Sequence, residues 1–570
     1  MSAATSLTEL EQIVRDYGPG LARRKLALIA RLERTQLPSA AAVTRYHEAL
    51  AFLHAYPDDL AVRRRVVRAL RAFARRRDLV RFAPRLASSG IAGTRIDYRF
   101  YAKMAAWLAT RWPKRLSVDW REFEQGPLLE ALLPHLALPA ESLGLDEYAF
   151  GLRRWVARLK SPRESDAAFL VRRIAQLPMS AALRVTLVDV LDTPMSLAPG
   201  PGGPTRTGVE APAMRNAAGR VVWPRAVVPQ RQPLSRERPD LAAESRRPPL
   251  RMRAVSLADG ERLCELAREA MVTRQRDLDA FANADPRDVR IAEFEDGLSF
   301  VCYGVRPEDR LMFDAVYGYL TIKNGVPIGY VLTSSLYGSC EMAYNVFETY
   351  RGAEASLVYA RVLALCRHLF DADAFTIYPY QLGQDNDEAI ASGAWWFYYK
   401  LGFRPRDAAT RRLVRRELSR MERDLSYRSN AATLRRLARR HLYLHLGRDR
   451  RDVMGLLPFA NVGLAVTDRI AREFGADRAR AEDECADRVQ RLLGVRDLLG
   501  WSAGERLAWR RWAPIALALP GVARWSAAER RALALVIRAK GGRRESDFVR
   551  LFDAHEPLRR AVLALGARRR

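Results

Sequence analysis

Apolar residues recur three and four positions apart through most of residues 1–193, and arginines occupy many of the positions between them. The stretches "LARRKLALIARLERTQ" and "VRRRVVRALRAFARRRDLVRF" show this spacing most clearly. It places apolar side chains on one face of a helix and charged side chains on the other. We therefore predict an α-helical region over 1–193. It resembles a helical-repeat array, although no repeat of fixed period accompanies it.

Residues 194–250 interrupt this pattern. Eleven of the thirty prolines of the chain lie here, together with the run "APGPGGPTRTG". Proline removes a backbone donor and cannot continue a helix or an interior strand. This segment is predicted to be a linker, either disordered or in a polyproline-like conformation.

The pattern changes again over residues 251–407, where strand-like runs follow a first helix. In "AVYGYLTIKNGVPIGYVLTSS", Asn324-Gly325 separates two β-rich arms and predicts an antiparallel hairpin with a tight turn. The helical run "EASLVYARVLALCRHLF", the short strand "AFTIYPY" and a last helix follow. This order predicts a mixed α/β domain.

Beyond residue 407 basic amphipathic patterns return, among them "LRRLARRHLYLHL" and "AERRALALVIRAK". We therefore predict a second α-helical region over 408–570. The fold class that follows is α+β, with a central mixed sheet between two mainly helical regions.

Charge is unevenly distributed along the chain. The formal net charge is +29, yet acidic residues outnumber basic ones over 291–407, so the positive charge lies on the two flanks. Only seven of the 95 basic residues are lysines. Basic flanks are compatible with binding of a polyanion. They are equally compatible with solvated helix faces.

Several classes of protein are excluded by what the sequence lacks. No apolar run reaches the ~20 residues that a membrane span needs, and the N-terminal residues do not resemble a secretory signal. We expect a cytoplasmic protein. The five cysteines are scattered without metal-binding spacing. His441 and His445 share one face if "HLYLH" is helical, but no third ligand is evident, and we predict no metal site.

Residues 290–405 resemble the GNAT superfamily of acyl-CoA-dependent N-acyltransferases. The resemblance rests on three pieces in the family's order: the hairpin "YGYLTIKNGVPIGYVL", the segment "YNVFETYRGAEASLVYARVLALCRHLF", and "NDEAIASGAWWFYYKLGFRP". The second piece is similar to the family's strand, [Q/R]xxGx[G/A] loop and helix. The third is similar to its terminal Asn…Tyr-x-Lys-Leu-Gly-Phe signature. The function implied is transfer of an acyl group, most simply acetyl, from acyl-CoA to an amine of an unidentified acceptor.

The resemblance also implies the cofactor-binding residues. A splayed strand would pair with pantetheine, and a loop leading to a helix N-terminus would receive the pyrophosphate. The residues implied are Val346 and Phe347 beside pantetheine, Arg351, Gly352, Ala353, Ala355 and Ser356 in the loop, and Asn386 from the third piece. The loop departs from the pattern at Glu354, where the family has glycine.

Two residues are candidates for acid–base catalysis. Tyr398 occupies the place of the family's tyrosine, which protonates the departing thiolate. Tyr399 is rotated ~100° around the helix and should point elsewhere. An amine must lose a proton before it attacks, and Glu341, near the start of the strand that should splay, is the candidate base.

Two alternatives remain open at this stage. The GNAT-like region could be catalytically silent and form, with its helical flanks, an interaction platform for a polyanion or a protein. The chain could also be a transferase whose acyl or aminoacyl donor is bound to a large carrier, such as a carrier protein or a charged tRNA.

Overall fold

The computed structural model describes residues 2–235, 237–352 and 354–567. The chain divides into two compact units. The first contains residues 1–234, 261–283 and 322–328, and the second contains residues 235–260, 284–321 and 329–570. Helices and strands are both present, with one large mixed sheet, so the α+β prediction is confirmed at the level of fold class.

The first unit is mainly helical. Helices α1 (Ala3–Ile13), α2 (Leu21–Arg34), α3 (Ala40–Ala55) and α4 (Leu60–Phe73) pack against one another. The alternating pattern of the sequence accounts for this, because Leu28, Ile29 and Leu32 of α2 are buried while the arginines between them face outward. The remaining elements are α5 (Arg77–Phe82), β1 (Ile96–Arg99), α6 (Ala102–Arg111), β2 (Leu116–Val118), α7 (Gly126–Leu136), α8 (Pro139–Glu147), α9 (Leu152–Leu159), α10 (Asp166–Ala175), α11 (Ala181–Leu191), β3 (Pro194–Leu197), β4 (Met214–Arg215), β5 (Val221–Trp223), α14 (Asp279–Ala282) and most of α13 (Leu257–Val272).

The proline-rich segment 194–250 is mostly irregular, as its prolines predict, but it contributes to both units. Strand β3 pairs antiparallel with β1 and β2. Met214 and Trp223 are almost completely buried. These residues are therefore part of the first unit's folded body, which composition alone did not indicate.

The second unit is built on a nine-stranded sheet in the order β13-β14-β12-β11-β10-β9-β8-β7-β6. Its strands are β6 (Arg251–Ala254), β7 (Ala284–Glu293), β8 (Leu298–Val305), β9 (Ala315–Lys323), β10 (Val326–Leu336), β11 (Ser339–Val346), β12 (Ala374–Ile377), β13 (Arg404–Pro405) and β14 (Leu442–His445). The predicted hairpin is confirmed as β9 and β10. Asn324 and Gly325 at its turn both have positive φ, +50° and +81°, which Asn and Gly accept most readily.

One strand of this sheet comes from a segment that the sequence pattern assigned to a helix. Helix α20 (Ala431–Leu437) stops before "HLYLH", and Leu442–His445 is strand β14, paired antiparallel with β12. The predicted helix is wrong here. As a strand, the segment pairs its backbone with the edge of β12 and buries the side chains of Leu442 and Tyr443. His441 and His445 therefore do not share a helix face. The sheet extends beyond residue 407, the predicted end of the central domain.

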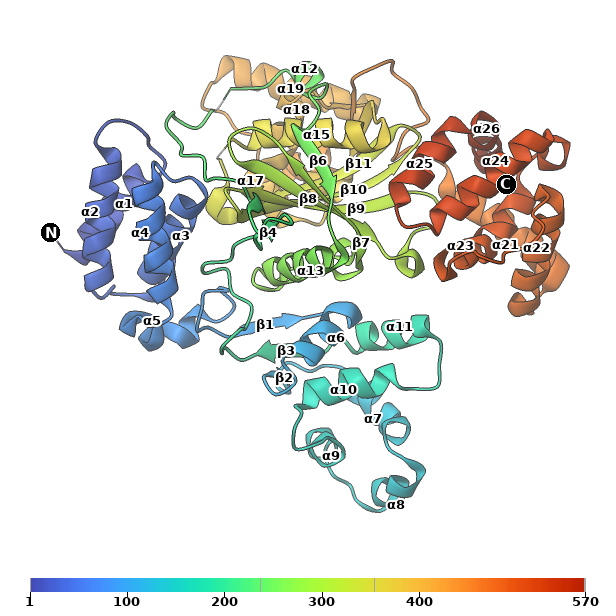
Figure 1. The fold of residues 1–570 in the computed structure, drawn as a ribbon, viewed down its shortest axis with the longest axis horizontal. Coiled ribbons are helices and arrows are strands. Elements are labelled where there is room, and N and C mark those ends of the chain that lie inside the picture. Colours follow the sequence, from blue (N-terminus) through green and yellow to red (C-terminus); the bar gives the residue numbers. More distant parts are fainter. Residues whose placement is uncertain (1, 236, 353, 568–570) are drawn as a thin grey trace. The chain divides into compact units, whose positions relative to one another are not determined.

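Helix α15 (Ala355–Phe370) packs on one face of the sheet (Figure 1). Eleven of its sixteen residues are buried, including Tyr359 and Cys366. The Tyr359 hydroxyl lies 3.6 Å from the Met342 sulfur on β11. The helix joins β11 to β12, and this crossover makes those two strands parallel neighbours.

The second unit also contains helices that precede and follow the strands along the chain. They are α12 (Leu241–Glu244), α16 (Pro379–Leu382), α17 (Asp387–Ser392), α18 (Ala394–Lys400), α19 (Ala408–Arg423), α21 (Phe459–Phe474), α22 (Arg478–Leu493), α23 (Ala503–Ala518), α24 (Ala527–Lys540), α25 (Glu545–Ala554) and α26 (Glu556–Ala567). Trp512 and Phe552 join the same apolar core as α15 and the sheet.

A buried ion pair links α24 to α25 beside the turn that precedes β9. Lys540 Nζ lies 2.6 Å from Glu545 Oε1, and both side chains are almost fully buried. Arg310 Nε lies 3.8 Å from the other carboxylate oxygen, and Arg310 also donates to the carbonyls of Lys540 and Gly542. Burial lowers the pKa of Lys540 and raises the pKa of Glu545, and their mutual attraction opposes both changes.

Replacement of Lys540 by Met is expected to lower the free energy of unfolding by about 3–5 kcal/mol, because Glu545 keeps a buried charge without its closest partner. Urea denaturation measures the loss. The double variant Lys540→Met/Glu545→Met should lose less than the sum of the two single variants. The control is Arg560→Met, which breaks an exposed pair with Glu556 and should cost less than about 1 kcal/mol. If Lys540→Met and Arg560→Met lowered the free energy of unfolding equally, the buried ion pair would be no more important than the exposed one.

Candidate cofactor site and active site

The site begins where strand β11 loses one of its neighbours. On one side β11 pairs with β10 over its whole length, from Ser339–Leu336 to Val346–Gly329. On the other side β12 pairs only as far as Met342–Ile377. The chain then turns through Pro379, the first residue of α16, and a proline has no backbone N–H to continue a ladder. The last four residues of β11 are thus left without β12 beside them.

A cavity of about 270 Å³ lies at this end of β11. It is bounded by β11, the loop after it, the start of α15, and helices α16, α17 and α18. Six predicted site residues line it: Val346, Arg351, Gly352, Ala355, Asn386 and Tyr398. Others in the lining were not singled out from the sequence: Tyr344, Asn345, Gln381, Glu388, Ala389, Ser392, Ala394 and Phe397.

Two predicted cofactor residues, Phe347 and Ser356, lie elsewhere. Phe347 is 5% exposed and packs near Tyr330, with ring centroids 6.1 Å apart. Ser356 lies in the first turn of α15 and does not contribute to the lining. Ala353 lies outside the described residues. The end of β11, the loop after it and α18 therefore line one cavity, but not every residue that the family alignment implies lies there.

The loop after β11 contains two positive φ angles. Gly352 has φ +77°, and Glu354, at the N-cap of α15, has φ +45° and ψ +21°. This left-handed conformation is easy for glycine and costs other L-residues on the order of 1 kcal/mol. The structure thus gives a physical reason why a glycine suits the position that Glu354 occupies in this chain.

Arg351 connects the loop to the other wall of the cavity. Its Nη2 forms an ion pair with Glu388 Oε1 on α17, and both side chains are about 40% exposed. Both residues line the cavity. The guanidinium is therefore near the entrance, where an anionic ligand could compete with the Glu388 carboxylate for it.

Tyr398 lies inside the cavity wall and is 3% exposed. Its ring packs edge-to-face against Tyr359 and Phe403, at 5.7 Å in each case. Burial raises the pKa of Tyr398, and a hydrogen bond with the Tyr344 backbone opposes this change in part. The phenol keeps its proton at neutral pH and can act as a donor to an anion that forms beside it.

Tyr399, the next residue, points to another part of the unit, as the helical rotation predicts. Its ring stacks on Trp395 at 5.2 Å, and the Arg404 guanidinium lies 4.1 Å above it. Trp395 is fully buried and donates to the Leu437 carbonyl at 3.1 Å, so it belongs to the core. Of the two tyrosines only Tyr398 reaches the cavity.

Glu341 does not line the cavity with Tyr398. Side chains alternate along a strand, so Glu341 and Tyr344 of β11 face opposite sides of the sheet. Tyr344 faces α15 and α18, where its ring contacts Tyr359 and Phe397. On the other face Glu341 Oε2 lies 3.6 Å from His441 Nε2. No local pattern pairs these residues, because the apolar spacing around "HLYLH" predicts a helix and not a strand of this sheet.

Asn386 acts as the N-cap of α17. Its Oδ1 accepts from the Ala389 backbone amide at 3.1 Å, and its Nδ2 donates to the Tyr380 carbonyl at 3.1 Å. Since it also lines the cavity, the predicted role in cofactor binding and the observed role in capping concern the same side chain.

Comparison with known proteins adds no assignment, since no family model, curated protein or solved structure matches the chain. Among the described residues, no group of three or more His, Cys, Asp or Glu side chains is arranged to hold a metal ion. No helix in the described ranges is both long enough and apolar enough to cross a membrane.

Replacement of Asn386 by Ala is expected to lower the free energy of unfolding by about 1 kcal/mol, the usual cost of losing an N-cap. Chemical denaturation measures this change. Asn386→Asp keeps the capping oxygen and should retain most of the stability. If Asn386→Ala leaves stability unchanged, the capping hydrogen bond contributes nothing and only a role in ligand binding remains for this residue.

Proposed function

We propose that this chain is a GNAT-like N-acyltransferase that transfers an acyl group from acyl-CoA to an amine. The observation that carries the proposal is the position of the cavity. It lies where β11 has lost β12, before a loop that enters the N-terminus of the sixteen-residue helix α15, and it has the buried Tyr398 in its wall.

Each part of acyl-CoA has a chemical counterpart in this arrangement. The end of β11 offers a strand edge to the two amides of pantetheine, in the manner of an added strand. The N-terminus of α15 offers unpaired backbone N–H groups and the positive end of the helix dipole to the pyrophosphate. Arg351 adds a guanidinium at the cavity entrance.

The proposed reaction is direct attack of the amine nitrogen on the thioester carbonyl. A C–N bond forms and the C–S bond breaks, and the departing thiolate takes a proton from the Tyr398 hydroxyl. The attacking amine loses its proton to a base of the enzyme, and this proton balances the one that Tyr398 donates. No metal takes part in these steps.

Glu341 is the proposed base on the acceptor side. It adjoins Met342, the last β11 residue paired with β12, so the sheet opens immediately beyond it. A thioester in this opening would be accessible from both faces of the sheet. Tyr398 would then act from the α15 face and Glu341, with His441 at 3.6 Å, from the opposite face.

The first test compares Tyr398→Phe with the parent chain. Thiol release from acetyl-CoA is followed in the presence of a panel of primary amines, and acetyl-CoA affinity is measured by calorimetry. Loss of the general acid should slow turnover by about 10²-fold or more, with little change in affinity. Tyr399→Phe is the matched control, because its ring lies outside the cavity, and it should keep the parent rate.

Two results would overturn parts of this proposal. An unchanged rate in Tyr398→Phe would remove this residue from the mechanism while leaving the binding site intact. Failure of the folded parent to bind acetyl-CoA would remove free acyl-CoA as the donor and favour a carrier-bound one.

The second test replaces Glu354 by Gly in the full chain. The change removes a left-handed non-glycine residue and a negative charge next to the proposed pyrophosphate site. A solvated charge at this range contributes on the order of 1 kcal/mol, so acetyl-CoA should bind about fivefold more tightly. Glu354→Gln removes the charge alone and should give much of this gain. Weaker binding in both variants would show that the carboxylate supports the site.

A further inference from the structure

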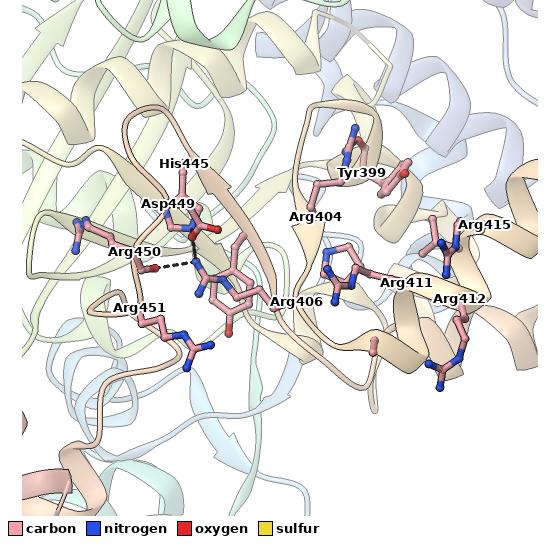
Figure 2. A pocket seen from close by; sticks show the side chains of 14 residues that line it. Tyr399, Arg404, Arg406, Arg411, Arg412, Arg415, His445, Asp449, Arg450 and Arg451 are labelled. Atoms are coloured by element: carbon pink, nitrogen blue, oxygen red, sulfur yellow. Dashed lines mark hydrogen bonds and ion pairs between the residues drawn. The ribbon is translucent and has the colours of Figure 1, made fainter.

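A second and larger cavity of about 950 Å³ is lined by Tyr399 of α18 and not by Tyr398 (Figure 2). Seven arginines line it, and we call it the arginine cleft. Arg411, Arg412 and Arg415 come from α19, Arg404 and Arg406 from β13 and the residue after it, and Arg450 and Arg451 from the loop after β14. Asp449 is the only acidic residue in this lining.

Three of the arginines are held by the protein itself. Arg404 donates to the Tyr399 carbonyl at 2.7 Å. Arg406 pairs with Asp449 and lies 2.9 Å from His445 Nε2. Arg450 donates to Asp373 and to the carbonyls of Tyr337 and Gly338. These contacts hold the three guanidinium groups in place.

The other four arginines carry uncompensated charge. Arg411, Arg412, Arg415 and Arg451 are exposed, and within the described residues none of their side chains has an acidic partner or a hydrogen bond. Figure 2 shows Arg411, Arg412 and Arg415 on one side of Arg406, and Arg451 on the other side, near Asp449 and Arg450. The positive charges of these guanidinium groups repel one another, and a bound anionic ligand would reduce this repulsion.

The arrangement of these charges favours a linear polyanion. Arg411 and Arg415 are four residues apart, about 6 Å along α19, and Arg412 lies between them. Figure 2 places these three on one side of Arg406 and Arg451 on the other, so the charges are spread across the cleft and do not surround one point, as they would at a site for a single phosphate. A nucleic-acid backbone carries one charge at every residue, whereas an acidic peptide must order flexible side chains to match.

Base recognition has little support in the cleft. The Tyr399 ring is covered by Trp395 and Arg404, and the Arg406 guanidinium lies 5.1 Å above the Tyr443 ring. The aromatic faces that could stack on bases are therefore occupied. Burial lowers the pKa of His445, which disfavours a positive charge on this residue.

We propose that the arginine cleft binds the phosphodiester backbone of a nucleic acid without sequence preference. The exposed guanidiniums of Arg411, Arg412, Arg415 and Arg451 form ion pairs with successive phosphates and release their counterions. The site is separate from the proposed acyl-CoA cavity, because α18 directs Tyr398 to one and Tyr399 to the other.

The experiment measures binding of the full chain to a labelled, mixed-sequence single-stranded RNA by fluorescence anisotropy, between about 50 and 200 mM salt. The test variant is Arg411→Gln/Arg412→Gln/Arg415→Gln. It should bind about tenfold more weakly at the lowest salt, and the slope of log K against log salt should fall in magnitude by about 2. A duplex RNA of the same sequence shows whether the cleft also accepts a double strand.

The matched control is Arg491→Gln/Arg496→Gln/Arg531→Gln, which removes three exposed arginines that do not line the cleft. It should stay within about twofold of the parent. A triple Arg→Lys variant of the cleft keeps the charge and should retain most of the affinity. Acetyl-CoA affinity should be the same in the parent and the cleft variant, which separates this test from that of the proposed function.

The proposal would be overturned by no binding of either RNA by the parent at the lowest salt, by equal losses in the cleft and control variants, or by equally strong competition from a poly-glutamate peptide of matched charge. A cleft variant that binds RNA as the parent does, with an unchanged melting curve, would show that any binding occurs elsewhere.

Discussion

The unequal pairing of β11 is the constraint on which the candidate active site depends. β11 has β10 beside it for eight residues but β12 for only four. Helix α15 forces the two parallel strands together at their start, and Pro379 ends their pairing. A longer β12 would fill the position of the cavity with a strand. The early turn therefore creates the space, the exposed strand edge and the opening between the two faces of the sheet.

Helix α18 divides two regions of opposite character. Its residue Tyr398 contributes to a cavity lined mostly by uncharged side chains, and its neighbour Tyr399 contributes to the arginine cleft. A single turn of helix can serve both because successive side chains differ by about 100° in direction. The "FYYKLGF" run is thus more than a helix end. Each of its tyrosines belongs to a different proposed site.

The second unit contains buried charges that are paired with one another and exposed charges that are not. Lys540, Glu545 and Arg310 are removed from water and compensate one another within the core. Arg411, Arg412 and Arg415 of α19 face solvent, and their side chains have no acidic partner among the described residues. A buried charge without a partner would cost several kcal/mol, so the protein pairs it, while an exposed one costs little and remains available to a ligand.

The sequence by itself determined the local features. The helical pattern of residues 1–193, the turn at Asn324–Gly325 and the helix of 355–370 follow from periodicity and turn chemistry, which depend on near neighbours. The family resemblance brought together Val346, Arg351, Gly352, Ala355, Asn386 and Tyr398, which do line one cavity. Only the tertiary structure decided that "LYLH" is a strand, that Glu341 meets His441 across the sheet, and that arginines from three segments share a cleft. These outcomes depend on which distant segment supplies a strand's neighbour, and no local pattern carries that information.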